Sequence, residues 1–369
     1  MTKKAMRVFM VMGMFVAVVA IGAMLMTPAP VKSAHQYAGT FYVAGMGGHI
    51  AKLDVTIDPS AEAPIAITKF DRIELGESSS HPVHDVRIDG DTMYWATYKK
   101  DKAASNQLHY GSIDLKSGSV SADKAVAVPD YAEWAGANYC GSGQTANSYM
   151  TVSMAKEGYL TVIDKKTMEV KEQVKLGPLV KDGNYKFWHG TNHPDGKTFL
   201  LSANLATPKT KDSWDATGDV LLVNVDAAAL EKGEIKEIAR NVIKGGNKNG
   251  TISFRQYFTP DGKFLLQSAN DQFYLVDAKT LKLVAKENRQ AGGAHDAMPT
   301  PDGKYAILTL RGPNPEINTE EKIVDGFVQL YDLTKKELVG KPTSVCYSCH
   351  KDEGYDGKSI LCGIEATWK

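Results

Sequence analysis

Hydrophobic and polar residues alternate along most of the chain in short runs, and many of these runs follow one repeated turn. Three copies of Pro-Asp-Gly-Lys begin at Pro194, Pro260 and Pro301, each just before an alternating apolar segment. Degenerate copies begin at Ile88 and Tyr355. Proline fixes the first corner of such a turn and glycine accepts a positive φ, so the turn suits two antiparallel strands. The pattern predicts a series of β-hairpins.

A second pair of strands follows the turns. The segments Leu160–Asp164, Phe273–Asp277 and Phe327–Asp332 are apolar, end in aspartate, and precede a turn that contains lysine and then another strand. Four short antiparallel strands with a period of about 40 to 55 residues are typical of a β-propeller blade. An open β-solenoid is the alternative, but its repeats are shorter.

Counting these units predicts an all-β, seven-bladed β-propeller over residues 35–369. Complete units begin near residues 84, 134, 186, 253 and 294, with a first unit around 57–75. Residues 350–368 supply about two strands of the seventh, and residues 39–44 and 49–55 supply the missing ones. We therefore expect N- and C-terminal strands to share a blade, which leaves no free sheet edge.

Two connections are longer than the repeat requires, at residues 207–218 and 243–255. Long Gly- and Asn-containing loops on a rigid scaffold often bind ligands or partners. The alternative is that both are tolerated surface insertions.

Residues 1–34 have the pattern of a secretory signal peptide. Lys3, Lys4 and Arg7 form a positive region, an uncharged apolar run covers 8–26, and a small-x-small cleavage pattern ends at Ala34. The apolar run is long enough to remain as an uncleaved membrane anchor. In either case the rest of the chain is expected outside the cytoplasm, in the periplasm or a comparable lumen.

Composition narrows the function classes. The 369 residues include 43 basic and 43 acidic side chains, and 43% of the residues are hydrophobic. These values exclude a disordered chain and a polytopic membrane protein, and they argue against nucleic-acid binding, which usually needs a basic surface. After signal cleavage we expect no membrane span.

Five residues occupy the same phase before the successive turns: His84, His189, Arg255, His295 and His350. This phase opens the innermost strand of each blade, so the side chains are expected to converge at one mouth of the central channel. Such a cluster can bind an anion, a metal or a planar cofactor. The alternative is that these residues only form hydrogen bonds between blades.

The most specific motif is Cys346-Tyr-Ser-Cys349-His350, which has the C-x-x-C-H spacing of c-type haem attachment. The two cysteines would bind the haem covalently and His350 would ligate the iron. Candidates for the other iron ligand are His295 and Met298. The competing hypothesis is a disulfide between Cys346 or Cys349 and Cys362, which an oxidising compartment permits. No nucleophile elbow, P-loop or Rossmann fingerprint is present in the sequence.

The Pro-Asp-Gly-Lys turns and the strands ending in apolar-Asp resemble exported propellers of the YVTN type, which are similar to those of cytochrome cd1 nitrite reductase and amine dehydrogenase heavy chains. The resemblance covers about residues 40–369 and implies the fold more strongly than an activity.

Signal peptide, chain length, the long loop and the cysteine-bearing tail together resemble the β subunit of hydrazine synthase from anammox bacteria. That resemblance implies a non-catalytic propeller held between haem-containing subunits of a complex that makes hydrazine from nitric oxide and ammonium, in the anammoxosome lumen. Haems would then lie on the partner subunits, and C-x-x-C-H is a departure from the pattern. A loop would modulate the passage of an intermediate; its residues here would include Lys244, Asn247, Lys248, Asn249 and Arg255.

Overall fold

The computed structural model describes residues 37–98, 107–132, 139–154, 158–180, 185–206, 216–246, 250–288, 293–312, 326–346 and 361–369. The expected signal peptide, most of the 207–218 connection, Asn247–Asn249, Cys349 and His350 lie outside these residues. Within the described residues we find no helix long and apolar enough to cross a membrane.

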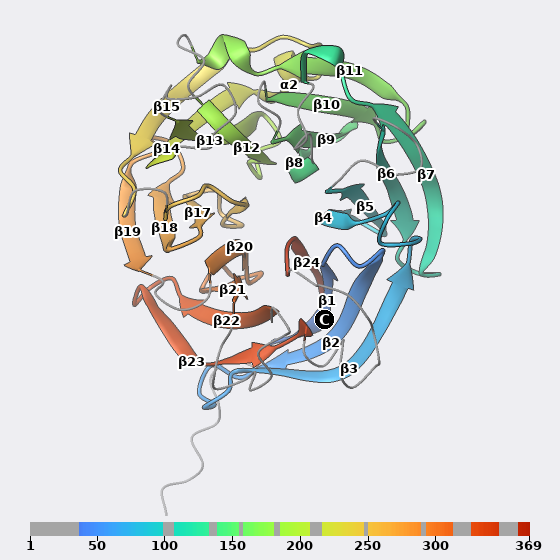
Figure 1. The fold of residues 1–369 in the computed structure, drawn as a ribbon. Coiled ribbons are helices and arrows are strands. Elements are labelled where there is room, and N and C mark those ends of the chain that lie inside the picture. The colour runs from blue at the N-terminus through green and yellow to red at the C-terminus, as the bar shows by residue number, and fades with distance from the viewer. Residues whose placement is uncertain are drawn as a thin grey trace, which may run out of the picture. The chain divides into compact units, whose positions relative to one another are not determined.

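In these residues the strands form six four-stranded antiparallel sheets around a central axis, which identifies the fold as a β-propeller (Figure 1). From the innermost strand outward, blade 1 contains β24 (Ile364–Trp368), β1 (Tyr37–Ala44), β2 (His49–Ile57) and β3 (Ile65–Glu74); blade 2 contains β4 (Val83–Asp89), β5 (Thr92–Thr97), β6 (Gln107–Asp114) and β7 (Ser119–Ala127); blade 3 contains β8 (Tyr139–Gln144), β9 (Ser148–Ser153), β10 (Tyr159–Asp164) and β11 (Val170–Lys175). Blade 4 contains β12 (Tyr185–Asn192), β13 (Thr198–Ala206), β14 (Ala216–Asp226) and β15 (Glu237–Ile243); blade 5 contains β16 (Gln256–Phe258), β17 (Phe264–Ala269), β18 (Gln272–Asp277) and β19 (Leu283–Asn288); blade 6 contains β20 (Gly293–Pro299), β21 (Tyr305–Arg311), β22 (Gly326–Asp332) and β23 (Glu337–Ser344). The short helices are η1 (Asp130–Ala132), η2 (Gly177–Leu179) and α2 (Ala227–Leu230).

The expectation of seven blades is wrong, because one blade was counted twice. Residues 65–74 form a single, mostly exposed outer strand, β3, and not a blade of their own. β3 pairs with β2, and β24 pairs with β1, so the supposed first and seventh units are one sheet. The two chain ends do share a blade, with three strands from the N-terminal side and one from the C-terminal side. The ring is closed, which excludes the solenoid alternative.

The hydrophobic core gives the same blade count. Six clusters of buried residues are found in the described part of the chain, and each lies between two neighbouring sheets. Between blades 1 and 2, for example, Ile50 packs in the cluster that contains Val83 and Trp95. Because a propeller sheet buries both faces against its neighbours, six interfaces in a closed ring correspond to six blades.

The repeated turns form as their residues require. Gly196, Gly262 and Gly303 have φ values of 65°, 68° and 66°, which glycine adopts without strain. In the turn before β17, the Thr259 hydroxyl donates to Asp261 Oδ1 at 2.7 Å, and Asp261 Oδ1 accepts from the backbone N–H of Lys263 at 3.1 Å. These local bonds stabilise the hairpins that carry the inner strands.

Candidate functional site in the central channel

β-Bulges set the direction of the side chains that line the channel. The pairing register shifts at His84 in β4, at Cys140 in β8 and at His295 in β20. A bulge adds one residue to a strand and changes the direction of the side chains around it. As a result, the consecutive pairs His84–Asp85 and His295–Asp296 are both at most 2% exposed.

Arg255, the residue before β16, extends from blade 5 across the channel to blade 2. Its guanidinium donates from Nε to Asp85 Oδ1 at 3.0 Å and from Nη2 to His84 Nδ1 at 2.6 Å. Nη2 also donates to the His84 carbonyl oxygen, and Nη1 donates to His295 Nδ1 at 3.1 Å. The side chain is fully buried. One permanent cation therefore connects blades 2, 5 and 6 at the axis.

The channel histidines are neutral. Burial, together with the positive charges of Arg255 and Arg311, holds the pKa values of His84 and His295 well below the ordinary value of 6.5. Because both Nδ1 atoms accept from Arg255, the ring proton of each lies on Nε2. Burial, and then Arg255, lowers the pKa of His189 to about 3.

Two cysteine thiols lie beside the group formed by Arg255 and the channel histidines. Cys140 Sγ lies 2.9 Å from His189 Nε2, and His189 Nδ1 lies 3.1 Å from the Phe187 carbonyl oxygen. The carbonyl can only accept, so Nδ1 carries the proton and Nε2 accepts from the thiol. Burial raises the pKa of Cys362 to about 11 even though the Arg255 guanidinium opposes the shift, and burial raises the pKa of Cys140 as well. Both cysteines are free thiols.

We expect both channel thiols to resist modification in the folded protein. In a chain with Cys346 and Cys349 replaced by serine, an aromatic disulfide reagent should react with Cys140 and Cys362 only after denaturation, because the thiolate is the nucleophile and neither side chain is accessible. A Ser60→Cys variant at an exposed turn is the matched control and should react at once. Rapid reaction of the two channel thiols without unfolding would contradict the buried arrangement.

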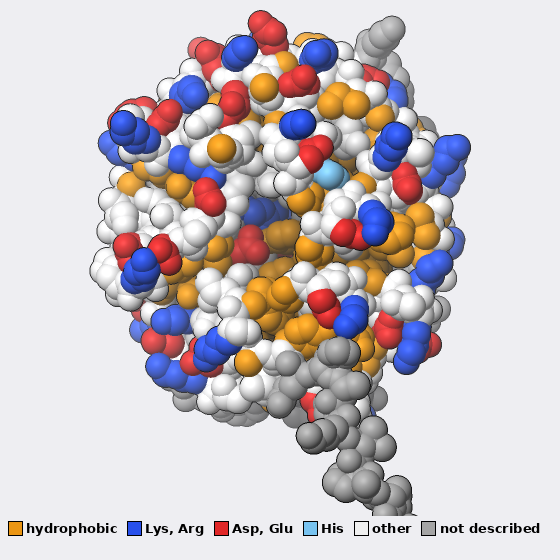
Figure 2. All heavy atoms as spheres, turned by 180° about the vertical axis from the view of Figure 1, so that it is seen from behind, with side chains coloured by type: hydrophobic (Ala, Val, Ile, Leu, Met, Phe, Trp, Pro, Cys, Tyr) orange, Lys and Arg blue, Asp and Glu red, His pale blue; other side chains and the backbone are white. Residues whose placement is uncertain are grey.

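A second layer lies further along the channel. Arg87 donates from Nε to the Ser142 carbonyl oxygen at 2.9 Å and from Nη1 to the Tyr257 hydroxyl at 2.5 Å. The Tyr257 hydroxyl lies 3.3 Å from Glu365 Oε2. Burial raises the pKa of Glu365 to about 7 and that of Asp296 to about 6, with Arg87 opposing both shifts. Figure 2 shows a hollow at the centre of the ring with basic, acidic and hydrophobic side chains at its floor.

Of the predicted channel residues, the structure brings His84, Arg255 and His295 into direct contact. His189 pairs with Cys140, and the Phe254 ring lies between the two groups, 6.0 Å from the His189 ring and 4.4 Å from the His295 ring. Arg255 was expected both in the channel and in a partner-binding loop, and its complete burial places it in the channel alone.

The other predicted site residues lie outside the channel, and some of them are not among the described residues. Cys346 and Met298 belong to the hydrophobic cluster between blades 6 and 1. Lys244 is exposed, and its Nζ lies 2.5 Å from Asp219 Oδ2. Cys349, His350 and the loop residues Asn247, Lys248 and Asn249 are outside the described residues.

Sequence reasoning missed most of the other polar groups of the channel and considered Cys362 only as a disulfide partner. The missed groups are Asp85, Arg87, Cys140, Tyr257, Asp296 and Glu365. The repeated dipeptide His-Asp at 84–85 and 295–296 is a signal that could have identified the two aspartates. No comparable pattern marks Cys362 or Glu365, which enter the channel with β24.

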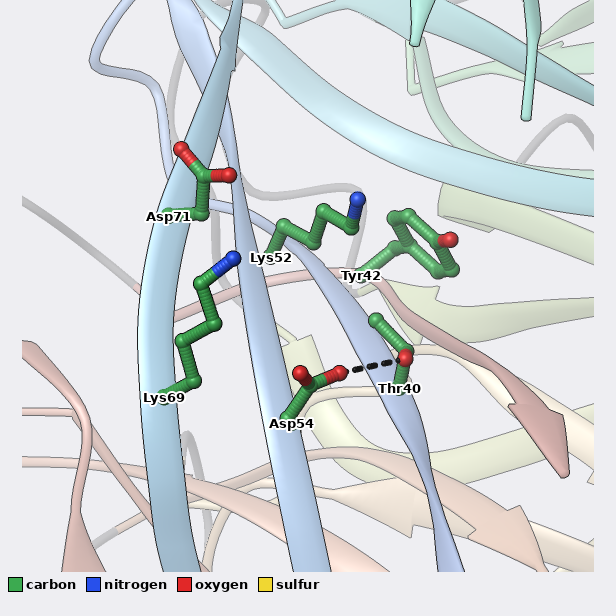
Figure 3. A pocket seen from close by; sticks show the side chains of 6 residues that line it. All are labelled: Thr40, Tyr42, Lys52, Asp54, Lys69 and Asp71. Carbon is green, nitrogen blue, oxygen red and sulfur yellow. Dashed lines mark hydrogen bonds between the residues drawn. The ribbon is translucent and has the colours of Figure 1, made fainter. Parts of the chain in front are cut away.

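A pocket on one face of blade 1 is interpreted as part of the solvated surface of the sheet (Figure 3). It is lined by Thr40, Tyr42, Lys52, Asp54, Lys69 and Asp71. The Thr40 hydroxyl donates to Asp54 Oδ1 at 2.7 Å. Lysines and aspartates from adjacent strands occur there in equal number, as is typical of a solvated sheet face.

No family model matches the chain, and no curated protein sequence matches it. Among solved structures, the chain is similar to a protein of unknown function from Bacteroides caccae, with 12% identity and a TM-score of 0.52, over 89% of this chain and 98% of that one. It also aligns with the β-propeller domain of Cps50 (Swd1) from Myceliophteria thermophila, with 13% identity and a TM-score of 0.40, over 72% and 88% of the two chains. At 12% identity, the likeness to the Bacteroides caccae protein bears on the fold alone.

Proposed function

We propose that the chain is an exported electron-transfer propeller that carries one c-type haem on Cys346 and Cys349, with His350 as an iron ligand. The proposal rests on the C-x-x-C-H spacing and on the signal-peptide pattern of residues 1–34. When bound, the haem supplies one-electron transfer.

The position of Cys362 is the observation that carries this proposal. The competing hypothesis for the motif pairs Cys346 or Cys349 with Cys362 in a disulfide. Cys362 is instead a free thiol at the channel axis, fully buried beside Arg255. The free Cys362 thiol weighs against that pairing, and the C-x-x-C-H spacing in a chain with a signal-peptide pattern then favours haem attachment.

Of the two predicted additional iron ligands, Met298 suits a haem better than His295. Cys346 follows β23 in an apolar cluster that also contains Met298, and an apolar surrounding suits the edge of a porphyrin. His295 fits less well, because its Nδ1 accepts from Arg255 and its Nε2 then holds a proton in place of a free lone pair. We therefore propose that Met298 would be the second protein ligand of the iron.

Covalent haem is the test. The full chain, expressed with cytochrome c maturation machinery, should give a haem-stained band and a c-type pyridine haemochrome spectrum with about one haem per chain. The variants Cys346→Ser and Cys349→Ser should lose the covalent haem. Cys362→Ser and Cys140→Ser are the matched controls and should keep it. A wild-type chain that carries no covalent haem under these conditions would overturn the proposal.

A second candidate function is the one implied by the resemblance to hydrazine synthase: a haem-free scaffold subunit whose 243–255 loop contacts haem-containing partners. One observation favours it, since residues of this loop on either side of Asn247–Asn249 are held by hydrogen bonds. Gly246 N–H donates to Thr251 Oγ1 at 2.9 Å, and the Thr251 hydroxyl donates to Asp271 Oδ1 at 2.8 Å. This candidate leads if the wild-type chain lacks haem and co-purifies with multihaem subunits from its source.

A further inference from the structure

A separate group of ionisable side chains lies on blade 2, away from the channel residues. His81 Nε2 is 3.0 Å from Asp123 Oδ2, and His109 Nδ1 is 3.3 Å from Asp123 Oδ1. The two imidazole centroids are 4.3 Å apart. We propose that these three side chains bind one divalent transition-metal ion of the zinc class.

The strand register places two of the ligands on one face of the sheet. Gly111 of β6 pairs with Asp123 of β7, so His109, two residues before Gly111, is the diagonal neighbour of Asp123. Gly111 leaves room for the Trp95 ring, because a Cβ at this position would lie 2.5 Å from the ring. Trp95 therefore forms the floor beside the histidines, with its centroid 5.9 Å from that of His81.

A tight turn before β4 supplies the third ligand. The backbone N–H of His81 donates to the Glu77 carbonyl oxygen at 2.7 Å. The imidazole lies against Gly76, where a Cβ would be 2.6 Å from His81 Nδ1. The ring is thus held in place by backbone contacts, which is the kind of prior positioning that a metal ligand requires.

Ser80 supports the His81 ring on the side away from Asp123. Ser80 Oγ lies 2.8 Å from His81 Nδ1 and 3.2 Å from the Glu77 carbonyl oxygen. With Nδ1 held by Ser80, Nε2 is the ring nitrogen that faces Asp123 Oδ2, at 3.0 Å. With a metal ion on Nε2, Nδ1 would carry the ring proton and donate to Ser80 Oγ, the kind of outer contact that metal-bound histidines commonly make.

The two imidazole rings, with centroids 4.3 Å apart, both face one carboxylate. A divalent ion can use one nitrogen lone pair from each ring and the carboxylate at once. Ligands of tetrahedral Zn²⁺ at about 2.0–2.1 Å are ~3.3 Å apart, close to the separations observed here. The ligand atoms of all three side chains lie within 4.8 Å of one another.

The donor set defines the class of ion. Two imidazole nitrogens and one carboxylate suit Zn²⁺, Ni²⁺, Cu²⁺ or Co²⁺ better than Ca²⁺ or Mg²⁺, which prefer oxygen ligands. The side chains of His81 and His109 are 12% and 14% exposed and that of Asp123 is 39% exposed, so the ion is reached from solvent. Ser80 would act as the hydrogen-bonded support of one ligand.

The test is metal binding to the full chain after chelator treatment and dialysis. Titration calorimetry with Zn²⁺, and metal counting after equilibrium dialysis, should show one site of micromolar or tighter Kd in the wild type. His81→Gln, His109→Gln and Asp123→Asn should each weaken that site at least tenfold, and Ser80→Ala about tenfold. His193→Gln is the matched control and should leave it unchanged, because His193 also pairs with an aspartate, Asp195, at 3.1 Å.

A second measurement needs no variant of the ligands. Co²⁺ bound in place of Zn²⁺ should give the visible absorption of a tetrahedral site, and Cu²⁺ should quench the fluorescence of wild-type protein more than that of Trp95→Phe. These readouts are independent of the haem motif, so their failure is distinguishable from failure of the proposed redox function. Absence of stoichiometric Zn²⁺ binding, or binding that the His81 and His109 variants retain, would overturn the proposal in favour of a hydrogen-bonded ion pair.

Discussion

Replacing Arg255 with methionine should lower the free energy of unfolding by about 3–5 kcal/mol, the usual effect of removing one partner of a buried ion pair. Methionine fills a similar volume but donates no hydrogen bond. The Asp85 carboxylate would lose the nearer of its two cationic partners, at 3.0 Å, and keep Arg87 Nη1 at 3.5 Å. His84 Nδ1 and His295 Nδ1 would lose their donor. Urea unfolding followed by far-ultraviolet circular dichroism measures the change through the midpoint at an unchanged slope.

Two comparisons separate the electrostatic cause from simple loss of packing. Lys244→Met removes an exposed partner of Asp219 and should change the midpoint very little. Asp85→Asn combined with Arg255→Met should destabilise less than the sum of the single changes by about 1 kcal/mol or more, because the pair is coupled. Strict additivity of the two changes would mean that Arg255 acts only by filling space.

Glu365→Gln should stabilise the protein increasingly as the pH rises. Burial raises the folded-state pKa of Glu365 from 4.5 to about 7, so the folded chain holds this proton more tightly than the unfolded chain. The stability contributed by this carboxyl is complete below about pH 4.5 and is lost as the pH rises through 7. Glutamine carries no such charge. Since solvent reaches part of the side chain, we expect the stability difference between variant and wild type to grow by about 2 kcal/mol from pH 5 to pH 8.

The measurement is the difference between the unfolding free energies of the two proteins at each pH, so the titration of the channel histidines cancels. Glu62→Gln provides a control that should give a flat profile over this range. Its hydrogen bond with Lys341 lowers the pKa of Glu62, so the stability from this carboxyl is complete above about pH 4.5 and is lost only at lower pH. A flat or falling profile for Glu365→Gln would show that Arg87 holds the carboxylate ionised in the folded protein.

The turn and strand pattern could be predicted from the sequence because its determinants are local. Asp164, Asp277 and Asp332 each accept backbone N–H bonds in the turn that follows the third strand. The fourth residue after each of them has a φ of 55°, 56° or 62°. Blade number is different, since it depends on which distant strand pairs with β1. That pairing is set by tertiary contacts across the ring and has no local signature.

The channel was predictable only in part for the same reason. The phase of the turns identifies His84, His189, Arg255 and His295 as residues at the start of inner strands. The bulges that add Asp85 and Asp296 to the channel are shifts of register between strands, and a single strand does not encode them. Cys140 meets His189 because Gly141 and Gly190 let two inner strands approach closely; a Cβ on Gly141 would lie 3.1 Å from the Gly190 nitrogen.

The pairing of β24 with β1 also sets an order of events during synthesis and folding. Tyr42 of β1 pairs with Glu365 of β24, which is made about 320 residues later. Until then the inner edge of blade 1 has open hydrogen-bonding groups that can pair with another chain. The same late segment delivers Cys362 and Glu365 to the axis. An interrupted chain would therefore keep its early blades while lacking both the seal of the ring and part of the channel chemistry. The pairing of β24 with β1 therefore closes the ring and completes the channel site at the same time.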